Sequence, residues 1–314
     1  MAPAISAGAT EKRRGNREGK VTYAPDVMLA ETLRFMEENR NRPMFIFFST
    51  NLPHGPVDIP PEENTYAGSP AIRQAYGNAS GTNRECSGAA EEYASMVDKL
   101  DRQVGAIVDQ VRKLGLDKRT IIIFSSDNGH ELYYRTDKGR GRGPDCHGGV
   151  LDGTGELLDV FRGSRGRVGP NNAMANLAGL KWTSHEGGIR VPLIISWPGT
   201  LPHGKVCHSL VANYDHMASF ADLAGIRMPE GKDAVSYMDI LSGNSARQRD
   251  YVVVDHTVIT GDGWKLTQKQ NKPFLFHIGR DPEERNNLAG TRKDQLEKLR
   301  AIYRKEVGSP RKDR

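Results

Sequence analysis

Residues 91–125 decide the fold. They begin with the segment EEYASMVDKLDRQVGAIVDQVRKL (91–114), and after Gly115 they continue to TIIIFS (120–125). The apolar side chains of the first segment recur at helical spacing, which predicts an amphipathic helix that Gly115 ends. The second segment is a short apolar run typical of a buried strand. A similar run, MFIFF (44–48), precedes the helix, so strand, helix and strand follow in the order of a βαβ unit.

The flanking segments extend this pattern into an α/β fold. Residues 25–41 predict a helix, residues 191–196 a third strand and residues 213–225 a short helix. We therefore expect a mostly parallel sheet with helices on both faces. From about residue 250 the chain changes to short apolar runs, which predict a small antiparallel sheet closed by a helix at 293–307. The expected division is a disordered basic leader at 1–20, an α/β core at 21–245 and a C-terminal α+β subdomain at 246–314.

Composition limits the classes of protein that fit. The 314 residues include 44 Lys and Arg against 39 Asp and Glu, a net charge of +5, and 37% are apolar, which permits a sizeable core. Apolar runs fall well short of ~18 residues, so no membrane span is expected. Basic residues gather in the two tails without a stacking or helix-turn-helix pattern, which argues against a nucleic-acid partner. Three cysteines without CxxC spacing indicate neither a zinc site nor a disulfide framework.

Polar side chains follow the first two predicted strands, at the sheet edge where ligands bind in parallel sheets. Asp127 and Asn128 come just after TIIIFS and offer carboxylate and amide oxygens, the hard ligands that suit Ca²⁺ or Mg²⁺. His54 follows the first strand, between two prolines. Plainer interpretations stand beside these: Asp-Asn-Gly is also a common turn, and His54 is equally explained as a surface loop residue.

A third polar set runs from Lys181 to Pro192. A lysine placed before the Gly187-Gly188 turn could hold a positive charge against an oxyanion. An ordinary loop lysine explains the same residue. Glu186 and Arg190 could simply pair with each other or cap the strand that follows.

Six segments, in their order along the chain, carry a resemblance to a known family. They are Leu52–Pro56, Tyr93–Gly105, Ser126–Gly129, Lys181–Pro192, Trp197–Gly199 and Asp281–Leu288. Each piece alone is of moderate specificity, whereas six in one order are highly specific. From about residue 20 onward, nearly the whole chain resembles the arylsulfatase-like sulfatase family of the alkaline-phosphatase-like superfamily.

The resemblance implies a fold and a set of roles. The fold would be part of an alkaline-phosphatase-like α/β core, with a mostly parallel sheet and flanking helices, plus the small C-terminal antiparallel subdomain. Asp127 and Asn128 match metal ligands, usually for Ca²⁺. Lys181 matches the lysine that binds the sulfate and assists the leaving group, and His54 matches the general acid at the ester oxygen. A cation and a lysine would neutralise the negative charge spread over a sulfate ester. His130 could contact the substrate, and a structural role explains it equally well.

The family's nucleophile is absent from this sequence. Sulfatases use formylglycine, made from a cysteine or serine in a Cys-x-Pro/Ala-x-Arg pattern, and Cys86, Cys146 and Cys207 all lie outside such a pattern. The early Asp-Asp metal pair and a Lys-x-His pair are missing too, so only half of the expected calcium ligands are present. These elements normally lie in an earlier part of the fold. The chain therefore resembles the C-terminal portion of a sulfatase.

Two hypotheses follow, with a third less favoured. In the first, the chain is a truncated sulfuric ester hydrolase, inactive alone because the nucleophile is absent. In the second, it is a degenerate, non-catalytic relative that binds sulfated glycans. The third is a phosphatase or phosphodiesterase of the same superfamily, which would use two zinc ions and His-rich ligands. Asp215-His216 mimics such a ligand pair but opens an amphipathic helix, which favours a structural role.

The long segment 131–180 is a candidate for contacts with the substrate, and residues 1–20 are where a secretory signal would be sought. A loop of such length is usually either functional or disordered. Its basic side chains predict a cleft lining that favours polyanionic sulfated sugars, and a solvated loop is an equal alternative. These side chains are Arg135, Lys138, Arg140, Arg142, Arg162, Arg165 and Arg167. Family members are commonly periplasmic or secreted, but residues 1–20 have no apolar segment of a secretory signal.

Overall fold

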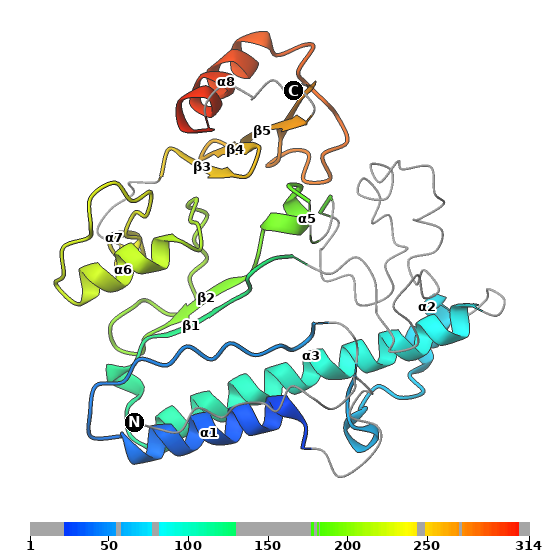
Figure 1. The fold of residues 1–314 in the computed structure, drawn as a ribbon, viewed down its shortest axis with the longest axis vertical. Coiled ribbons are helices and arrows are strands. Elements are labelled where there is room, and N and C mark those ends of the chain that lie inside the picture. The colour runs from blue at the N-terminus through cyan, green and yellow to red at the C-terminus, as the bar shows by residue number, and fades with distance from the viewer. Residues whose placement is uncertain are drawn as a thin grey trace, which may run out of the picture. The chain divides into compact units, whose positions relative to one another are not determined.

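The computed structural model describes residues 22–54, 58–76, 82–129, 177–178, 181, 183–243, 249–269 and 272–307 (Figure 1). The chain divides into two compact units. Among the described residues, those up to Leu114 form the first unit and those from Gly115 onward form the second. Helices occur in both units and paired strands in the second, which confirms the expected α/β class.

The first unit is built on two helices that lie side by side, α1 (Ala24–Glu38) and α3 (Thr82–Lys113) (Figure 1). The connection between them contains a 3₁₀ turn, η1 (Pro61–Glu63), and a short helix, α2 (Pro70–Tyr76). Both expected helices are confirmed, although α3 begins earlier than the sequence predicted. The shared core consists of Tyr23, Leu52, Ile59, Ile72, Ala90, Tyr93, Ala94 and Met96.

A buried lysine ties these elements together. The ammonium of Lys99, on α3, forms ion pairs with Asp26 of α1 at 2.6 Å and with Glu63 of η1. Because Lys99 is almost fully buried, its charge needs both carboxylates. Charged residues recur along α3, and no helix in the described ranges is both long and apolar enough to cross a membrane.

The strand expected over Met44–Phe48 is wrong. These residues belong to no strand, and the side chains of Phe45 and Phe47 are 74% and 83% exposed. A buried parallel strand needs neighbours to complete its ladder and layers to cover both faces. No other strand occurs among the described residues of the first unit, and the central side chains Phe45, Ile46 and Phe47 are exposed while Met44 and Phe48 are half-buried.

In the second unit, a short 3₁₀ turn, η2 (Asp117–Arg119), leads into a two-stranded ribbon of β1 (Ile122–Ser125) and β2 (Leu193–Ser196). The strands pair antiparallel, with Phe124 opposite Ile194. The two expected strands are thus confirmed, but parallel pairing is wrong for them. The apolar runs identify the strands, whereas their direction depends on the long connection between them, and the sequence pattern does not encode that path. Three short helices complete this part, α5 (Glu186–Ile189), α6 (Asp215–Leu223) and α7 (Met238–Leu241).

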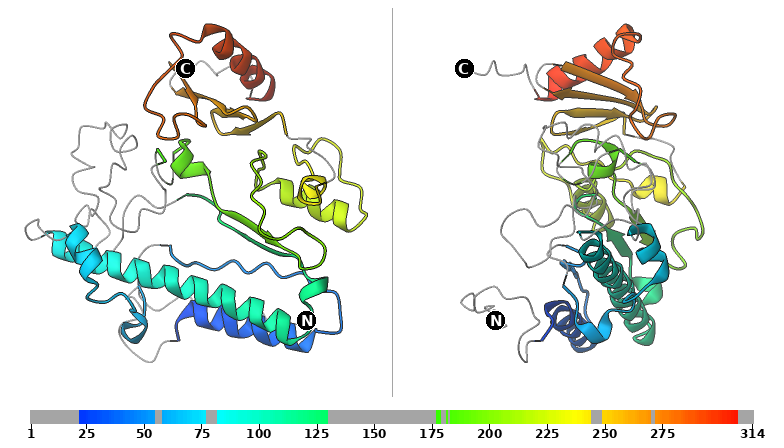
Figure 2. Two further views of the ribbon diagram at one scale, coloured as in Figure 1. Left: turned by 180° about the vertical axis from the view of Figure 1, so that it is seen from behind. Right: turned by 90° about the vertical axis from the view of Figure 1, so that its right-hand side faces the viewer.

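The small antiparallel sheet expected in the C-terminal part is confirmed, and it has four strands in the order β3-β4-β5-β6. Its strands are β3 (Tyr251–Val254), β4 (Thr257–Thr260), β5 (Trp264–Lys269) and β6 (Lys272–His277). The closing helix α8 (Lys293–Val307) lies over one face of the sheet (Figure 2). The core between them consists of Val258, Leu266, Leu275, Leu296, Leu299 and Tyr303.

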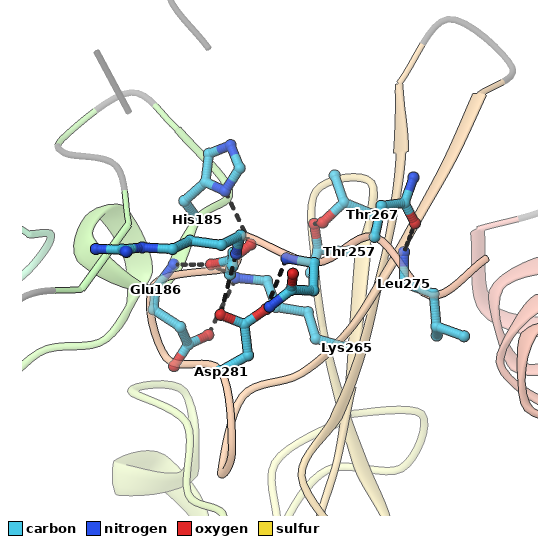
Figure 3. A network of polar contacts seen from close by, with 11 residues as sticks. His185, Glu186, Thr257, Lys265, Thr267, Leu275 and Asp281 are labelled. Carbon is cyan, nitrogen blue, oxygen red and sulfur yellow. Dashed lines mark hydrogen bonds and ion pairs between the residues drawn. The ribbon is translucent and has the colours of Figure 1, made fainter. Parts of the chain in front are cut away.

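A buried polar network joins this sheet to α5. Lys265 of β5 is fully buried, and its ammonium donates to Glu186 at 3.0 Å and to Glu284 at 2.9 Å. Glu284 also accepts the backbone N–H of Glu186 at 2.7 Å and contacts Nδ1 of His185 at 2.8 Å. Figure 3 shows His185 and Glu186 from α5 and its flank converging with Lys265 from the sheet. Burial by itself would raise the pKa of Glu284, but the His185 hydrogen bond and the Lys265 charge hold that pKa below its usual value.

Truncating the helix–sheet core should destabilise the chain. Leu299→Ala removes a fully buried side chain of α8, so we expect the free energy of unfolding to fall by about 2–5 kcal/mol. Urea titration followed by tryptophan fluorescence measures this, because Trp264 lies in β5. The neighbouring, exposed Lys298→Ala is the control and should change stability by less than about 0.5 kcal/mol. Equal effects of the two substitutions would contradict the packing of α8 on the sheet.

Acid should weaken the network through Glu284. The pKa of this carboxyl in the folded chain lies below its usual 4.5, so its contribution is complete above that pH and is lost as the pH falls through the lower folded value. We expect the urea midpoint of the unaltered chain to drop between about pH 5 and pH 3 more steeply than that of Glu284→Gln. Parallel pH profiles for the two proteins would show that Glu284 does not carry this linkage.

Candidate active site

The turn that follows β1 holds the two candidate metal ligands. The side chain of Asp127 is exposed, and that of Asn128 is half-buried. One oxygen of Asp127 accepts the backbone N–H of Asn128 at 2.9 Å, and Ser126 Oγ donates to the Asn128 carbonyl at 2.9 Å. Asn213, just before α6, donates to the Ser126 carbonyl at 3.0 Å. Asp-Asn-Gly therefore forms a turn, as the plainer interpretation had it. The hydrogen bonds to its backbone hold in place the residues that carry the two candidate ligands.

Gly129 fixes this turn against α5. Its N–H donates to the carbonyl of Gly188 at 2.9 Å. A Cβ atom built on Gly129 would lie 1.8 Å from the carbonyl oxygen of Gly187, which is less than any real contact distance. Only a glycine permits this approach of two backbones. The turn after β1 is thus held against Gly187 and Gly188 of α5.

Lys181 is half-buried in a turn that precedes α5. His185 stands at the N-cap of α5, and Glu186 is buried in its first turn. The N–H of Gly187 donates to the carbonyl of Ala178 at 2.6 Å, which anchors the start of the same segment. Glu186 lies 3.9 Å from Arg190, but its closer partner is Lys265 at 3.0 Å. The expected Glu186–Arg190 pair is therefore a minor contact.

His54 lies in the first unit, on the turn that follows the exposed apolar segment. Its N–H donates to the carbonyl of Asn51 at 2.7 Å, and its side chain is exposed. Asp127, Asn128 and Lys181 all belong to the second unit. The role of His54 as a general acid stays a prediction. His130 and residues 131–176 lie outside the described residues, and so do the predictions that rest on them.

The donor set fits a hard cation only in part. Asn128 Nδ2 donates to the Gly129 carbonyl at 2.9 Å, so its Oδ1 is the atom that can bind a cation. With the Asp127 carboxylate this gives two oxygen donors, of the kind that Ca²⁺ binds, where six to eight are usual. Among the described side chains, no three His, Cys, Asp or Glu residues gather closely enough to hold a metal ion.

The cysteines do not provide a formylglycine. Cys207 is the one cysteine whose side chain the structure describes, and it is exposed. It is followed by His-Ser-Leu-Val rather than by the motif that the modification requires. Neither of the other two cysteines stands in that motif either, so no step through formylglycine is assigned to these residues.

Asp215 and His216 have structural roles, as the sequence indicated. The carboxylate of Asp215 accepts the N–H groups of Ala212 and Val235, both at 2.9 Å, and pairs with Arg249. His216 Nδ1 contacts the hydroxyl of Tyr237 at 2.7 Å. Burial lowers the pKa of His216, and the nearby Asp215 only partly opposes this shift. These contacts hold α6 in place and engage both carboxylate oxygens of Asp215 and Nδ1 of His216.

Sequence reasoning missed the buried partners behind α5. Lys265 sits beside Leu266 in a strand, and both side chains are buried. Alternation along a strand assigns one of two such neighbours to solvent, and a lysine is the obvious choice, so no local signal reveals its burial. Glu284 lies within the Asp281–Leu288 segment that carried the resemblance, which is the one signal that could have singled it out.

Comparison with known proteins follows these observations. The sulfatase family profile matches residues 5–226, and the profile described as N-sulphoglucosamine sulphohydrolase, C-terminal, matches residues 181–312. The N-acetylgalactosamine-6-sulfatase of Canis lupus familiaris is 24% identical over 315 residues, which covers 88% of this chain and 50% of the relative. The N-acetylgalactosamine-6-O-sulfatase of Bacteroides thetaiotaomicron is 24% identical over 286 residues, covering 84% and 47%. The chain spans about half the length of these curated relatives.

Solved structures show the same fold. One from work on glycosaminoglycan metabolism by Bacteroides thetaiotaomicron aligns with a TM-score of 0.66 and 22% identity, covering 90% of this chain and 54% of that one. A protein solved with its substrate D-glucosamine-2-N,6-O-disulfate aligns with a TM-score of 0.62 and 17% identity, covering 92% and 72%. The fold, the ordered motifs and a profile match over well more than half of the 314 residues agree: the chain belongs to the sulfatase family.

Proposed function

We propose that this chain is the later part of a sulfuric ester hydrolase that acts on a sulfated glycan. The observation that carries the proposal is the glycine-to-glycine contact between the Asp127–Asn128 turn and the Lys181–Arg190 segment, within a chain of the sulfatase family. This contact holds an oxygen-donor turn against the segment that carries the candidate lysine. Hydrolysis of a sulfate ester needs positive charge near the sulfate oxygens, and a bound cation and a fixed ammonium can both supply it.

Each candidate residue has a defined role in this proposal. Lys181 binds the sulfate and neutralises the charge that moves onto the bridging oxygen as the S–O bond breaks. His54 donates a proton to that oxygen, so the leaving group departs as an alcohol. Asp127 and Asn128 would hold Ca²⁺, which when bound supplies further positive charge at the sulfate. His130 is proposed as an additional substrate contact.

The glycan class is supported by the relatives. Two of the curated relatives are named as sulfatases of N-acetylgalactosamine, and a structural relative was solved with a disulfated glucosamine. The segment 131–180, between the proposed metal ligands and Lys181 in the sequence, contains seven Lys and Arg and six Asp and Glu, so its net charge is only +1. Its basic side chains would favour polyanionic sugars over neutral aryl esters if they line the sulfate site.

Calcium binding should depend on the turn after β1. Isothermal titration with CaCl₂ should give weak binding, with a Kd on the order of 10⁻⁴–10⁻³ M or above, because few oxygen donors are present. Asp127→Asn and Asn128→Ala should each remove the binding. Asp109→Asn, an exposed carboxylate on α3, is the matched control and should leave it unchanged. Calcium binding that survives both turn substitutions would place the metal elsewhere.

Sulfate-ester hydrolysis tests the reaction itself. The 314-residue chain should release no sulfate from N-acetylgalactosamine 6-sulfate, because its sequence has no nucleophile motif. The DNA upstream of Met1 is translated in all frames, and a chain extended by an Asp-Asp pair and a Cys-x-Pro/Ala-x-Arg motif should hydrolyse the ester. In that chain, Lys181→Ala should lower kcat by about 10²–10³-fold, whereas the exposed Lys205→Ala should not.

Two outcomes would overturn this proposal. Turnover by the 314-residue chain alone would mean that another group provides the nucleophile. Upstream sequence unrelated to sulfatases, combined with binding of sulfated glycans by the chain as it stands, would favour the non-catalytic alternative.

A further inference from the structure

The buried network behind α5 reaches the candidate site through a continuous set of contacts. Glu284 accepts the N–H of Glu186 at 2.7 Å and contacts Nδ1 of His185 at 2.8 Å, so one carboxylate fixes two consecutive residues. Figure 3 labels these two residues, His185 and Glu186. Lys265 bridges the carboxylates of Glu186 and Glu284 and is itself fully buried. The position of α5 is thus set by the C-terminal sheet.

A second connection links the same two elements. The N–H of Ala178 donates to the carbonyl of Pro282 at 3.4 Å, and the carbonyl of Ala178 accepts the N–H of Gly187 at 2.6 Å. The loop that carries Glu284 therefore reaches α5 by a side-chain route and by a backbone route. Both routes end in the first turn of α5, at Glu186 and Gly187, so movement of this loop would displace that turn.

From α5 the contact passes directly to the turn after β1. The carbonyl of Gly188 accepts the N–H of Gly129 at 2.9 Å, and the carbonyl of Gly187 leaves no space for a side chain there. Gly129 follows Asn128 without an intervening residue. Two backbones this close cannot shift independently, because interiors packed without voids transmit displacement rather than absorb it.

The backbone of Glu284 adds an independent observation. Its φ angle is 49°, in the left-handed region that residues other than glycine rarely adopt. Such a conformation costs free energy and persists only where surrounding contacts determine it. The contacts that do so here are those with His185, the Glu186 N–H and Lys265, because they engage both carboxylate oxygens of Glu284.

We propose that Glu284 and Lys265 are positioning residues for the Asp127–Asn128 turn, acting through α5 and the Gly188–Gly129 hydrogen bond. The C-terminal sheet and the loop after it would then help to position the candidate metal ligands. The inference rests on the proposed function only in taking Asp127 and Asn128 as ligands. The mechanical coupling from Glu284 to Gly129 stands without that assignment.

Amide hydrogen exchange measures the coupling without calcium or activity. The N–H of Gly129 is bonded to Gly188, so its protection reports whether α5 still meets the turn. In the 314-residue chain, Glu284→Gln should lower the protection of the Gly129 amide by at least about tenfold relative to amides that open only by global unfolding. Glu186→Gln keeps the backbone N–H and should give a smaller loss in the same direction, so it serves if Glu284→Gln fails to fold.

The control must destabilise the same unit without touching the network. Leu299→Ala shortens a side chain in the core between α8 and the sheet, and Leu299 makes none of the hydrogen bonds that run from Glu284 to Gly129. It should lower overall stability while leaving the protection of Gly129 unchanged relative to globally exchanging amides. Unchanged Gly129 protection in both network variants, or an equal loss in Leu299→Ala, would overturn the coupling.

Calcium titration of the same proteins separates this inference from the proposed function. We expect Glu284→Gln to weaken calcium binding at least about tenfold, although Glu284 contributes no ligand. The reason is that binding calcium would then also require the loosened turn to be ordered, which costs free energy. Loss of Gly129 protection in a chain that binds no calcium at all would refute the ligand assignment and leave the coupling in place. Unaltered calcium affinity despite a loosened turn would refute positioning of the ligands.

Discussion

The buried ammonium of Lys265 is the constraint on which the second unit depends. A lysine with no exposed surface is stable only where carboxylates surround it, and here they come from Glu186 and Glu284, far apart along the chain. The two carboxylates in turn need donors beyond one ammonium, and the Glu186 N–H and the His185 ring provide them. Each buried charge costs free energy alone and is offset by its partners, so β5, α5 and the loop at Glu284 stabilise one another.

Much of the fold followed from hydrophobic periodicity. The long stripe of α3 and the closing helix α8 could be predicted because each repeats its pattern over several turns. The prediction of a strand at Met44–Phe48 was wrong because a strand needs neighbouring strands to pair with. The sequence pattern of one segment does not say whether those neighbours are present. The direction of β2 against β1 failed for a related reason, since pairing is a property of two segments and of the path between them.

For the candidate site too, some residues could be predicted from the sequence and others could not. Asp127 and Asn128 could be singled out because polar residues directly after a buried strand lie where ligands bind. Lys181 was singled out by its place before two glycines, and its role stays a prediction. What positions them was hidden: Gly129 looks like an ordinary turn glycine until the carbonyl of Gly187 is seen against it, and Lys265 looks like a solvent-facing strand residue. Long-range contacts between polar residues leave no periodic trace.

The exposed run at Met44–Phe48 has a consequence for the life of this polypeptide. Five consecutive apolar residues, extended and free of charge, have the composition of segments that add to the edge of another chain's sheet. In a concentrated preparation, an exposed segment of this composition favours association between copies of the chain. Solubility would then depend on the exposure of Phe45 and Phe47, which lie at the centre of the segment.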